Sequence, residues 1–141
     1  MSFVADLHVH SCYSRATSKQ CNLEGFHYAA QRKGVRVVGT GDVTHPAWFA
    51  SLSEKLRPSA PGLYRLDEQS AAAVAEKVAP ACRAPVDFML TGDISSIYKR
   101  DGAVRKVHSI VMLPDLETAA RMNAWLDAVG NIRSDGRPIL G

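Results

Sequence analysis

Two histidines and an aspartate occupy alternate positions near the start of the chain, in Ala5-Asp6-Leu7-His8-Val9-His10-Ser11. Apolar residues fill the positions between them, which predicts a short buried strand whose successive side chains point to opposite faces. Asp6, His8 and His10 would then share one face, with the two imidazoles about 6 to 7 Å apart along the strand. Imidazoles at that spacing can reach one divalent ion, and a nearby carboxylate can bind the ion or orient a ring. The segment therefore predicts a metal site; the alternative is three polar residues at a frayed strand end.

Further polar residues lie at or near the ends of later predicted strands. They are Asp42, His45, Asp93 and His108. Because ligand sites of α/β folds form at the carboxyl ends of the strands, we expect these side chains to join the two N-terminal histidines. Mixed histidine and aspartate ligands suit Zn²⁺, Mn²⁺ or Fe²⁺ rather than Ca²⁺, and such a cluster can hold more than one ion. Taken singly, each residue also fits an ordinary role as a helix cap, a turn residue or a packed core histidine.

Composition excludes several classes of protein. The chain has 141 residues, 46% of them apolar and 22% charged, which is typical of one globular domain. A net charge of +3 is too small to indicate nucleic-acid binding by itself. We expect no signal peptide and no membrane span, and three cysteines without a Cys-x-x-Cys pair suit a reducing cytoplasm. Cys12 is read as a small buried thiol rather than a ligand. Signatures of Ser/His/Asp or Cys/His catalysis and of glycine-rich phosphate loops are missing from the sequence, which argues against covalent hydrolysis and against an NTPase.

Strand and helix patterns alternate along the chain, which predicts an α/β layer or barrel with a largely parallel sheet. Helices are expected over 23–33, 46–56, 68–78 and 116–129, the last with Trp125 on its apolar face. Strands are expected over 3–9, 35–40 and 86–91, as two strands joined at Asp101-Gly102 within 94–113, and at 138–141. Residues 57–70 are rich in proline and glycine and are expected to form a loop. No linker or repeat is visible, so residues 1–141 are interpreted as one domain.

With these motifs and this order of strands and helices, the sequence resembles the PHP (polymerase and histidinol phosphatase) domain family. Asp6-Leu7-His8-Val9-His10-Ser11 matches its first motif, and Thr40-Gly41-Asp42-Val43-Thr44-His45 is a variant of its Thr-Asp-His motif. The resemblance is closer still to the N-terminal domain of endonuclease Q, in blocks at 14–19, 39–48, 90–98, 104–108 and 134–141. It implies a distorted (β/α)7 barrel, of which about four or five strands would be present. It also implies two or three divalent ions, most often Zn²⁺ with Mn²⁺ or Mg²⁺ as alternatives.

The activity that this resemblance implies is hydrolysis of DNA phosphodiesters next to deaminated bases or abasic sites, in the cytoplasm. His8, His10, Asp42 and His108 would be metal ligands, with His45 as a shifted equivalent of the second-motif histidine. Asp93 stands where endonuclease Q carries glutamate and is one methylene shorter. Asp42 and Asp93 would be the catalytic carboxylates of a metal-assisted hydrolysis, in which a bound water ionises near pH 7 and a second ion stabilises the leaving oxygen.

The family's last Asp-x-His ligand pair and its closing strands have no counterpart up to Gly141. The chain is therefore expected to be an incomplete PHP domain, whose open side either a second copy or further chain would cover. This leaves open whether the chain alone is an enzyme. Two alternatives stand beside the endonuclease: a PHP phosphatase acting on a small phosphoester, and a truncated metal-binding remnant without catalysis.

Basic residues near the predicted site are candidates for contacts with phosphate groups. They are Arg15, Lys19, Lys99, Arg100, Arg105 and Lys106. The last four flank the predicted hairpin turn and would form a basic projection whose contacts with DNA do not depend on sequence and weaken with salt. The alternative for that projection is a solvated, charged hairpin.

Overall fold

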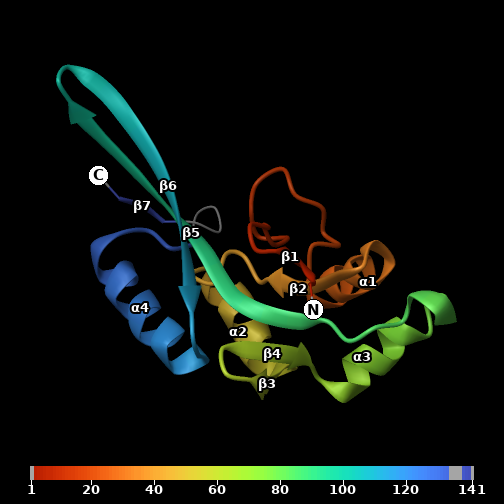
Figure 1. The fold of residues 1–141 in the computed structure, drawn as a ribbon. Helices are drawn as coiled ribbons and strands as arrows, with labels where there is room; N and C mark the ends of the chain where they lie inside the picture. Colours follow the sequence, from red (N-terminus) through yellow and green to blue (C-terminus); the bar gives the residue numbers. More distant parts are fainter. Residues whose placement is uncertain (1, 134–137, 141) are drawn as a thin grey trace.

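The computed structural model describes residues 2–133 and 138–140, which form a mixed α/β structure of seven strands and four α-helices (Figure 1). The strands are β1 (Val4–Asp6), β2 (Val35–Gly39), β3 (Leu56–Ala60), β4 (Leu63–Leu66), β5 (Asp87–Arg100), β6 (Ala103–Leu113) and β7 (Ile139–Leu140). The helices are α1 (Leu23–Lys33), α2 (Pro46–Lys55), α3 (Glu68–Ala75) and α4 (Leu116–Val129). A short 3₁₀ turn spans Pro80–Cys82. Among these residues no helix has the length and apolar character that crossing a membrane requires.

The strand β5 organises the sheet. The hydrogen-bonded order is β1-β2-β5-β4-β3, and β6 and β7 also pair with β5. The pairs β1–β2, β2–β5 and β5–β7 are parallel, whereas β3–β4, β4–β5 and β5–β6 are antiparallel. The sheet is therefore mixed rather than largely parallel, because two hairpins are built into it.

All four expected helices form, and local signals explain their ends. The Asn22 side chain accepts a hydrogen bond from the Gly25 amide at the start of α1, and Gly34 ends that helix with a φ of 71°. Pro46 occupies the first turn of α2, where its missing N–H costs no helical hydrogen bond. Asp115 caps α4 through the Thr118 amide. The helix α3 ends at Ala75, three residues before the predicted end at residue 78.

The core lies where α1, α2 and α4 meet the buried part of the sheet. Its largest fully buried side chains are those of Trp48, Phe88, Leu23, Leu52 and Leu90. These residues come from α2, β5 and α1, so that helices on different parts of the chain share one hydrophobic cluster. This packing holds the carboxyl ends of β2 and the middle of β5 together.

Three further expectations about the fold are wrong. Residues 57–70 were expected as a loop, but they contain the β3–β4 hairpin, whose turn includes Gly62 at a φ of 74°. Pro58 is compatible with β3 because this strand lies at the end of the sheet order, where one side of its backbone needs no partner. The sheet of the described residues has seven strands, hairpin strands included, and the expectation of four or five barrel strands stays a prediction.

The other two corrections concern burial. The first strand is short and exposed rather than buried, because β1 stands at the other end of the sheet order and pairs with β2. Trp125 was expected to face inward from α4 but is 61% exposed. The expected hairpin at Asp101-Gly102 is confirmed, although its first strand is continuous with the strand expected over 86–91.

Candidate metal centre

The backbone that carries His8 and His10 runs unusually close to the end of β2. A Cβ atom added to Gly39 would lie 2.7 Å from the Leu7 carbonyl oxygen, and one added to Gly41 would lie 2.1 Å from that of Val9. Both glycines are therefore required for this close approach, and Gly41 also has a φ of 61° that other residues rarely adopt. The residues after Asp6 are irregular rather than a continuation of β1, so the strand expected to reach Val9 is shorter than predicted.

Threonines and two helix residues fix the loop after β2. The Thr40 hydroxyl donates to the Thr91 carbonyl oxygen and accepts from the Thr91 amide, and the Thr91 hydroxyl accepts from the Gly41 amide. The Trp48 indole of α2 donates to the Thr40 and Gly41 carbonyl oxygens at 3.2 and 2.9 Å. The Asn123 amide of α4 donates to the Val43 carbonyl oxygen. The loop that follows β2 is thus held from β5, α2 and α4 at once.

Three predicted ligands meet in one group. Ligand atoms of His8, His10 and Asp93 all lie within 4.8 Å of one another. The two imidazole rings are 5.5 Å apart between centroids and inclined at 64°. Asp93 is buried, His10 is half-buried and His8 is exposed, so the group opens to solvent on the histidine side. Two imidazoles and a carboxylate at this spacing fit the donor set that Zn²⁺ and similar ions take in proteins.

Asp42 lies behind His10 and holds its ring. Its Oδ1 atom is 3.0 Å from Nδ1 of His10, while its Oδ2 atom accepts from the Ser11 amide, the Ser11 hydroxyl and the Ser14 hydroxyl. The carboxylate has no exposed surface, and these donors satisfy it in place of water. Its backbone has a φ of 45°, a left-handed conformation in a non-glycine residue. An aspartate in this position fixes the orientation of a ligand histidine.

His108 approaches the group from β6. Its Nδ1 atom is 3.6 Å from Oδ2 of Asp93, and its Nε2 atom is 3.2 Å from the Ser95 hydroxyl. On the other side, Oδ1 of Asp93 is 3.8 Å from Nδ1 of His10. The carboxylate of Asp93 therefore lies between His10 and His108, so the segment after β1, β5 and β6 bring these three side chains together.

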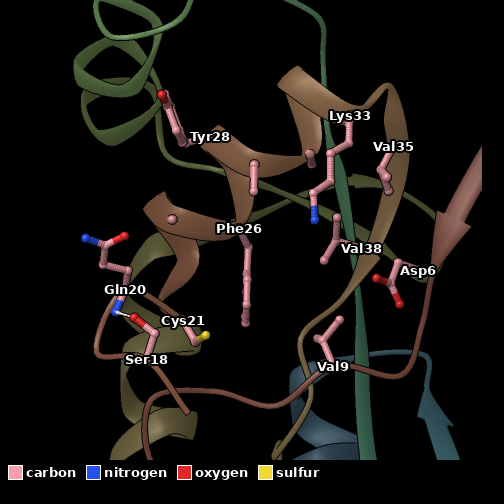
Figure 2. Close-up of a pocket in the computed structure, with 13 residues that line it drawn as sticks. Asp6, Val9, Ser18, Gln20, Cys21, Phe26, Tyr28, Lys33, Val35 and Val38 are labelled. Atoms are coloured by element: carbon pink, nitrogen blue, oxygen red, sulfur yellow. Dashed lines mark hydrogen bonds between the residues drawn. The ribbon is translucent and has the colours of Figure 1, made fainter.

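His45 and Asp6 lie outside the three-residue group. His45 occupies the N-cap position of α2 without a side-chain capping hydrogen bond, and its ring stacks on Tyr13 with centroids 4.6 Å apart. Burial lowers the pKa of His45, and the nearby Asp42 carboxylate partly opposes this shift. Asp6 was expected to share a face with the histidines. Instead it lines an open cleft of about 420 Å³ between α1, β1 and β2, together with Lys33 and Phe26 (Figure 2).

The predicted phosphate-binding residues are exposed and fall in two places. Arg15 and Lys19 belong to the loop that follows His10, whereas Lys99, Arg100, Arg105 and Lys106 lie near the end of the β5–β6 hairpin. Cys12, expected to be buried, is half-buried, and its thiol pKa is raised chiefly by burial.

The supporting residues Thr91 and Asn123 were not predicted. For Asn123 a signal exists in the sequence. It shares the buried face of α4 with Ala119 and Leu126, where an amide among apolar residues indicates a specific hydrogen bond.

Comparison with known proteins gives one consistent answer for the fold. No family model matches the sequence. An uncharacterized protein of Methanocaldococcus jannaschii is 41% identical over 49 residues, which is 35% of this chain and 6% of that protein. The crystal structure of an endonuclease Q complex with a 27-mer duplex bearing an abasic lesion at the active site is similar with a TM-score of 0.72 and 28% identity. The similarity covers 97% of this chain and 29% of that one.

A second solved structure agrees. The lesion-specific endonuclease Q of Pyrococcus furiosus is similar with a TM-score of 0.70 and 28% identity, over 100% of this chain and 30% of that one. The chain thus has an endonuclease Q-like fold, and it spans less than a third of the length of the solved relatives.

Proposed function

We propose that this chain provides the metal-binding part of a phosphoesterase that hydrolyses DNA next to deaminated bases or abasic sites. The observation that carries the proposal is the group formed by His8, His10 and Asp93, whose ligand atoms lie within 4.8 Å. It stands in a chain similar over 97% of its length to an endonuclease Q that was solved with an abasic lesion at its active site. The proposal includes a PHP-type barrel, to which the described sheet would contribute one part.

The donor set decides which ion fits. Two imidazoles with one carboxylate favour Zn²⁺, with Mn²⁺ as an alternative, over the all-oxygen environment that Ca²⁺ and Mg²⁺ prefer. A bound ion of this kind supplies a water that ionises near neutral pH and a positive charge for the phosphate oxygens. We assign the holding of that ion to His8, His10 and Asp93, and His108, whose Nδ1 atom is 3.6 Å from Oδ2 of Asp93, would be a ligand of a second ion.

The remaining predicted residues take supporting roles in this proposal. Asp42 accepts a hydrogen bond from the His10 ring and thereby orients its other nitrogen. The ordinary second-motif ligand roles of Asp42 and His45 stay predictions, since both lie outside the three-residue group. Arg15 and Lys19 lie in the exposed loop after His10, where they could hold phosphate groups of a bound strand.

The proposal is tested by metal content and nicking together. Purified protein is loaded with Zn²⁺ or Mn²⁺, analysed for bound metal, and incubated with duplexes that carry one uracil or one abasic site. Replacing either His8 or His10 by alanine is expected to remove most of the bound metal and all cleavage, because each change removes one of three ligands. His27→Gln is the matched control, because His27 belongs to α1, stacks on Phe88 of β5 and is outside the group.

The outcomes separate the hypotheses. Metal binding that depends on both histidines, with cleavage beside the lesion, supports the endonuclease. Cleavage of a chromogenic monoester without cleavage of DNA supports a small-molecule phosphatase. Metal binding without any turnover identifies a non-catalytic metal-binding protein. Unchanged metal content in both histidine variants overturns the site itself.

A further inference from the structure

The β5–β6 hairpin extends beyond the body of the molecule as an arm (Figure 1). Its strands pair without a break from Leu90 and Leu113 at the base to Arg100 and Ala103 at the tip. Asp101 and Gly102 form the two-residue turn, both with positive φ, at 52° and 74°. Residues from 98 to 110 are exposed on both strands. The regular pairing fixes which side chains share a face of the arm.

One face of the arm carries the candidate metal centre. Asp93 of β5 and His108 of β6 are 3.6 Å apart, and Ser95 opposite His108 contacts it on the same face. Since side chains alternate along each strand, the next pair on this face is Ile97 with Lys106. The pair after that is Lys99 with Val104. This face, the site face, therefore continues from the ligands to two lysines.

The opposite face carries the two arginines. Arg100 and Arg105 alternate with Lys99 and Lys106, so they point away from the face that holds Asp93 and His108. The Arg100 guanidinium also lies 3.8 Å from the Asp101 carboxylate, which offsets part of its charge. The four basic residues of the hairpin are consequently two pairs with different surroundings, although they are adjacent in the sequence.

The spacing on the site face matches an extended polyanion. Lys106 is two residues from His108 on the same strand, which places its backbone about 7 Å farther along the arm. Lys99 lies opposite Val104, two residues farther again, or about 14 Å from His108. One strand of duplex DNA carries a phosphate about every 3.4 Å along the helix axis, so a strand that follows the arm offers several phosphates to these two ammonium groups.

We propose that Lys106 and Lys99 bind the phosphates of one DNA strand and direct it along the site face toward His8, His10 and Asp93. The assignment rests on the proposed function for the nature of its ligand. It divides the basic hairpin into a binding face with the two lysines and an outer face with Arg100 and Arg105. The lysines are positioning residues, because they are two and four residue positions along the arm from His108 and do not contact the ion.

The test compares two double variants with the same change of charge, Lys99→Gln with Lys106→Gln and Arg100→Gln with Arg105→Gln. Binding of a fluorescein-labelled duplex that carries a tetrahydrofuran abasic analogue is followed by anisotropy between 50 and 200 mM salt, with EDTA present to prevent cleavage. Loss of two phosphate contacts is expected to lower the slope of log K against log salt by about 1.8, and to weaken binding on the order of tenfold or more. The arginine variant is expected to lose less than half as much of the slope.

Equal losses in the two variants, or a larger loss in the arginine variant, overturn the proposal, because a general charge effect of the arm does not distinguish its faces. No loss in the lysine variant overturns it as well. Urea midpoints of both variants should equal that of the parent, since exposed substitutions usually change stability by less than about 0.5 kcal/mol.

Metal content and nicking by the parent protein keep the two proposals separate. If the parent binds metal and cleaves DNA but the lysine double variant binds DNA as the parent does, the proposed function stands and the role of the site face is refuted. If the parent binds no metal but the lysine double variant loses DNA binding as expected, the role of the site face stands and the metal-dependent activity is refuted.

Discussion

The strand β5 is hydrogen-bonded along its whole length, yet its two halves lie in different surroundings. Near its start it is flanked by β2 and β4, and Phe88 and Leu90 have no exposed surface. Near its end it pairs with β6, and Tyr98, Lys99 and Arg100 are exposed. The comparison shows that backbone pairing can extend a strand well beyond the core, while the free energy of burial is gained at one end. Asp93 stands at the boundary, where the position of a ligand is still fixed by the core and the surface is already open.

The largest expected difference in stability is between an alanine substitution in the buried half of β5 and one on the exposed arm. Phe88→Ala removes a fully buried aromatic side chain from the core half and is expected to cost about 3 to 5 kcal/mol. Val104→Ala on the arm, where the valine is 56% exposed, should change stability by less than about 0.5 kcal/mol. Urea denaturation followed by far-UV circular dichroism measures both. A cost at Val104 comparable to that at Phe88 would show that the arm packs against something in solution.

Two glycines with positive φ sharpen the same comparison. A Cβ added to Gly41 in the core would lie 2.1 Å from the Val9 carbonyl oxygen, whereas one added to Gly102 at the tip of the arm would meet nothing within 4 Å. Gly102→Ala should therefore cost about 1 to 2 kcal/mol of backbone strain. Gly41→Ala must also displace the segment that carries His8 and His10, and its cost should exceed that of the tip variant by at least about 2 kcal/mol.

Metal titration of the two glycine variants adds an independent readout. Gly41→Ala is expected to weaken metal binding, because it moves two of the three candidate ligands, while Gly102→Ala should bind metal as the parent does. Equal stability losses in the two variants would contradict the close approach of the chain after β1 to the end of β2.

The smallest expected effect is the change in unfolding free energy with pH that His27 causes in the core. His27 is buried against Phe88, and this burial lowers its pKa below the usual value of 6.5. The folded state therefore resists protonation that the unfolded chain accepts, so the contribution to stability is complete above about pH 6.5 and is lost as the pH falls below it. The urea midpoint should fall between pH 7.5 and pH 5.5, and it should fall less in His27→Leu. An identical fall in both proteins would assign the effect to other groups.

The parts of the fold that sequence predicted are those with local causes. Asn22 and Asp115 cap their helices through amides three residues away, and Asp101-Gly102 determines a turn by its own backbone preferences. The β3–β4 hairpin was missed because β4 is held in the sheet by pairing with β5 and β3 by pairing with β4, while the composition of 57–70 is that of a loop. Burial of β1 was predicted wrongly for a related reason, since a strand's place in the sheet order is not a property of its own residues.

The candidate site divides in the same way. The sequence predicted that His8, His10, Asp93 and His108 lie close together, but on the premise that they stand at strand ends. In the structure the two histidines follow β1, and Asp93 and His108 lie inside β5 and β6. The close approach that positions the histidines depends on Gly39 and Gly41 meeting a segment some thirty residues earlier in the chain, and periodicity carries no information about such a contact. The hydrogen bond of 3.0 Å between Asp42 and His10 likewise joins residues 32 positions apart, and the sequence pattern does not predict it.

The ligand group draws on chain segments that are distant in sequence, His8 and His10 at one end and Asp93 far downstream. An unfolded chain does not hold these donors together, so an ion bound here would join the segment after β1 to β5 only in the folded state. By mass action, free metal at 100 times its dissociation constant would then add about 2.7 kcal/mol to the free energy of unfolding. The concentration of the free ion would in that way set the stability of the folded state as well as the occupancy of the site.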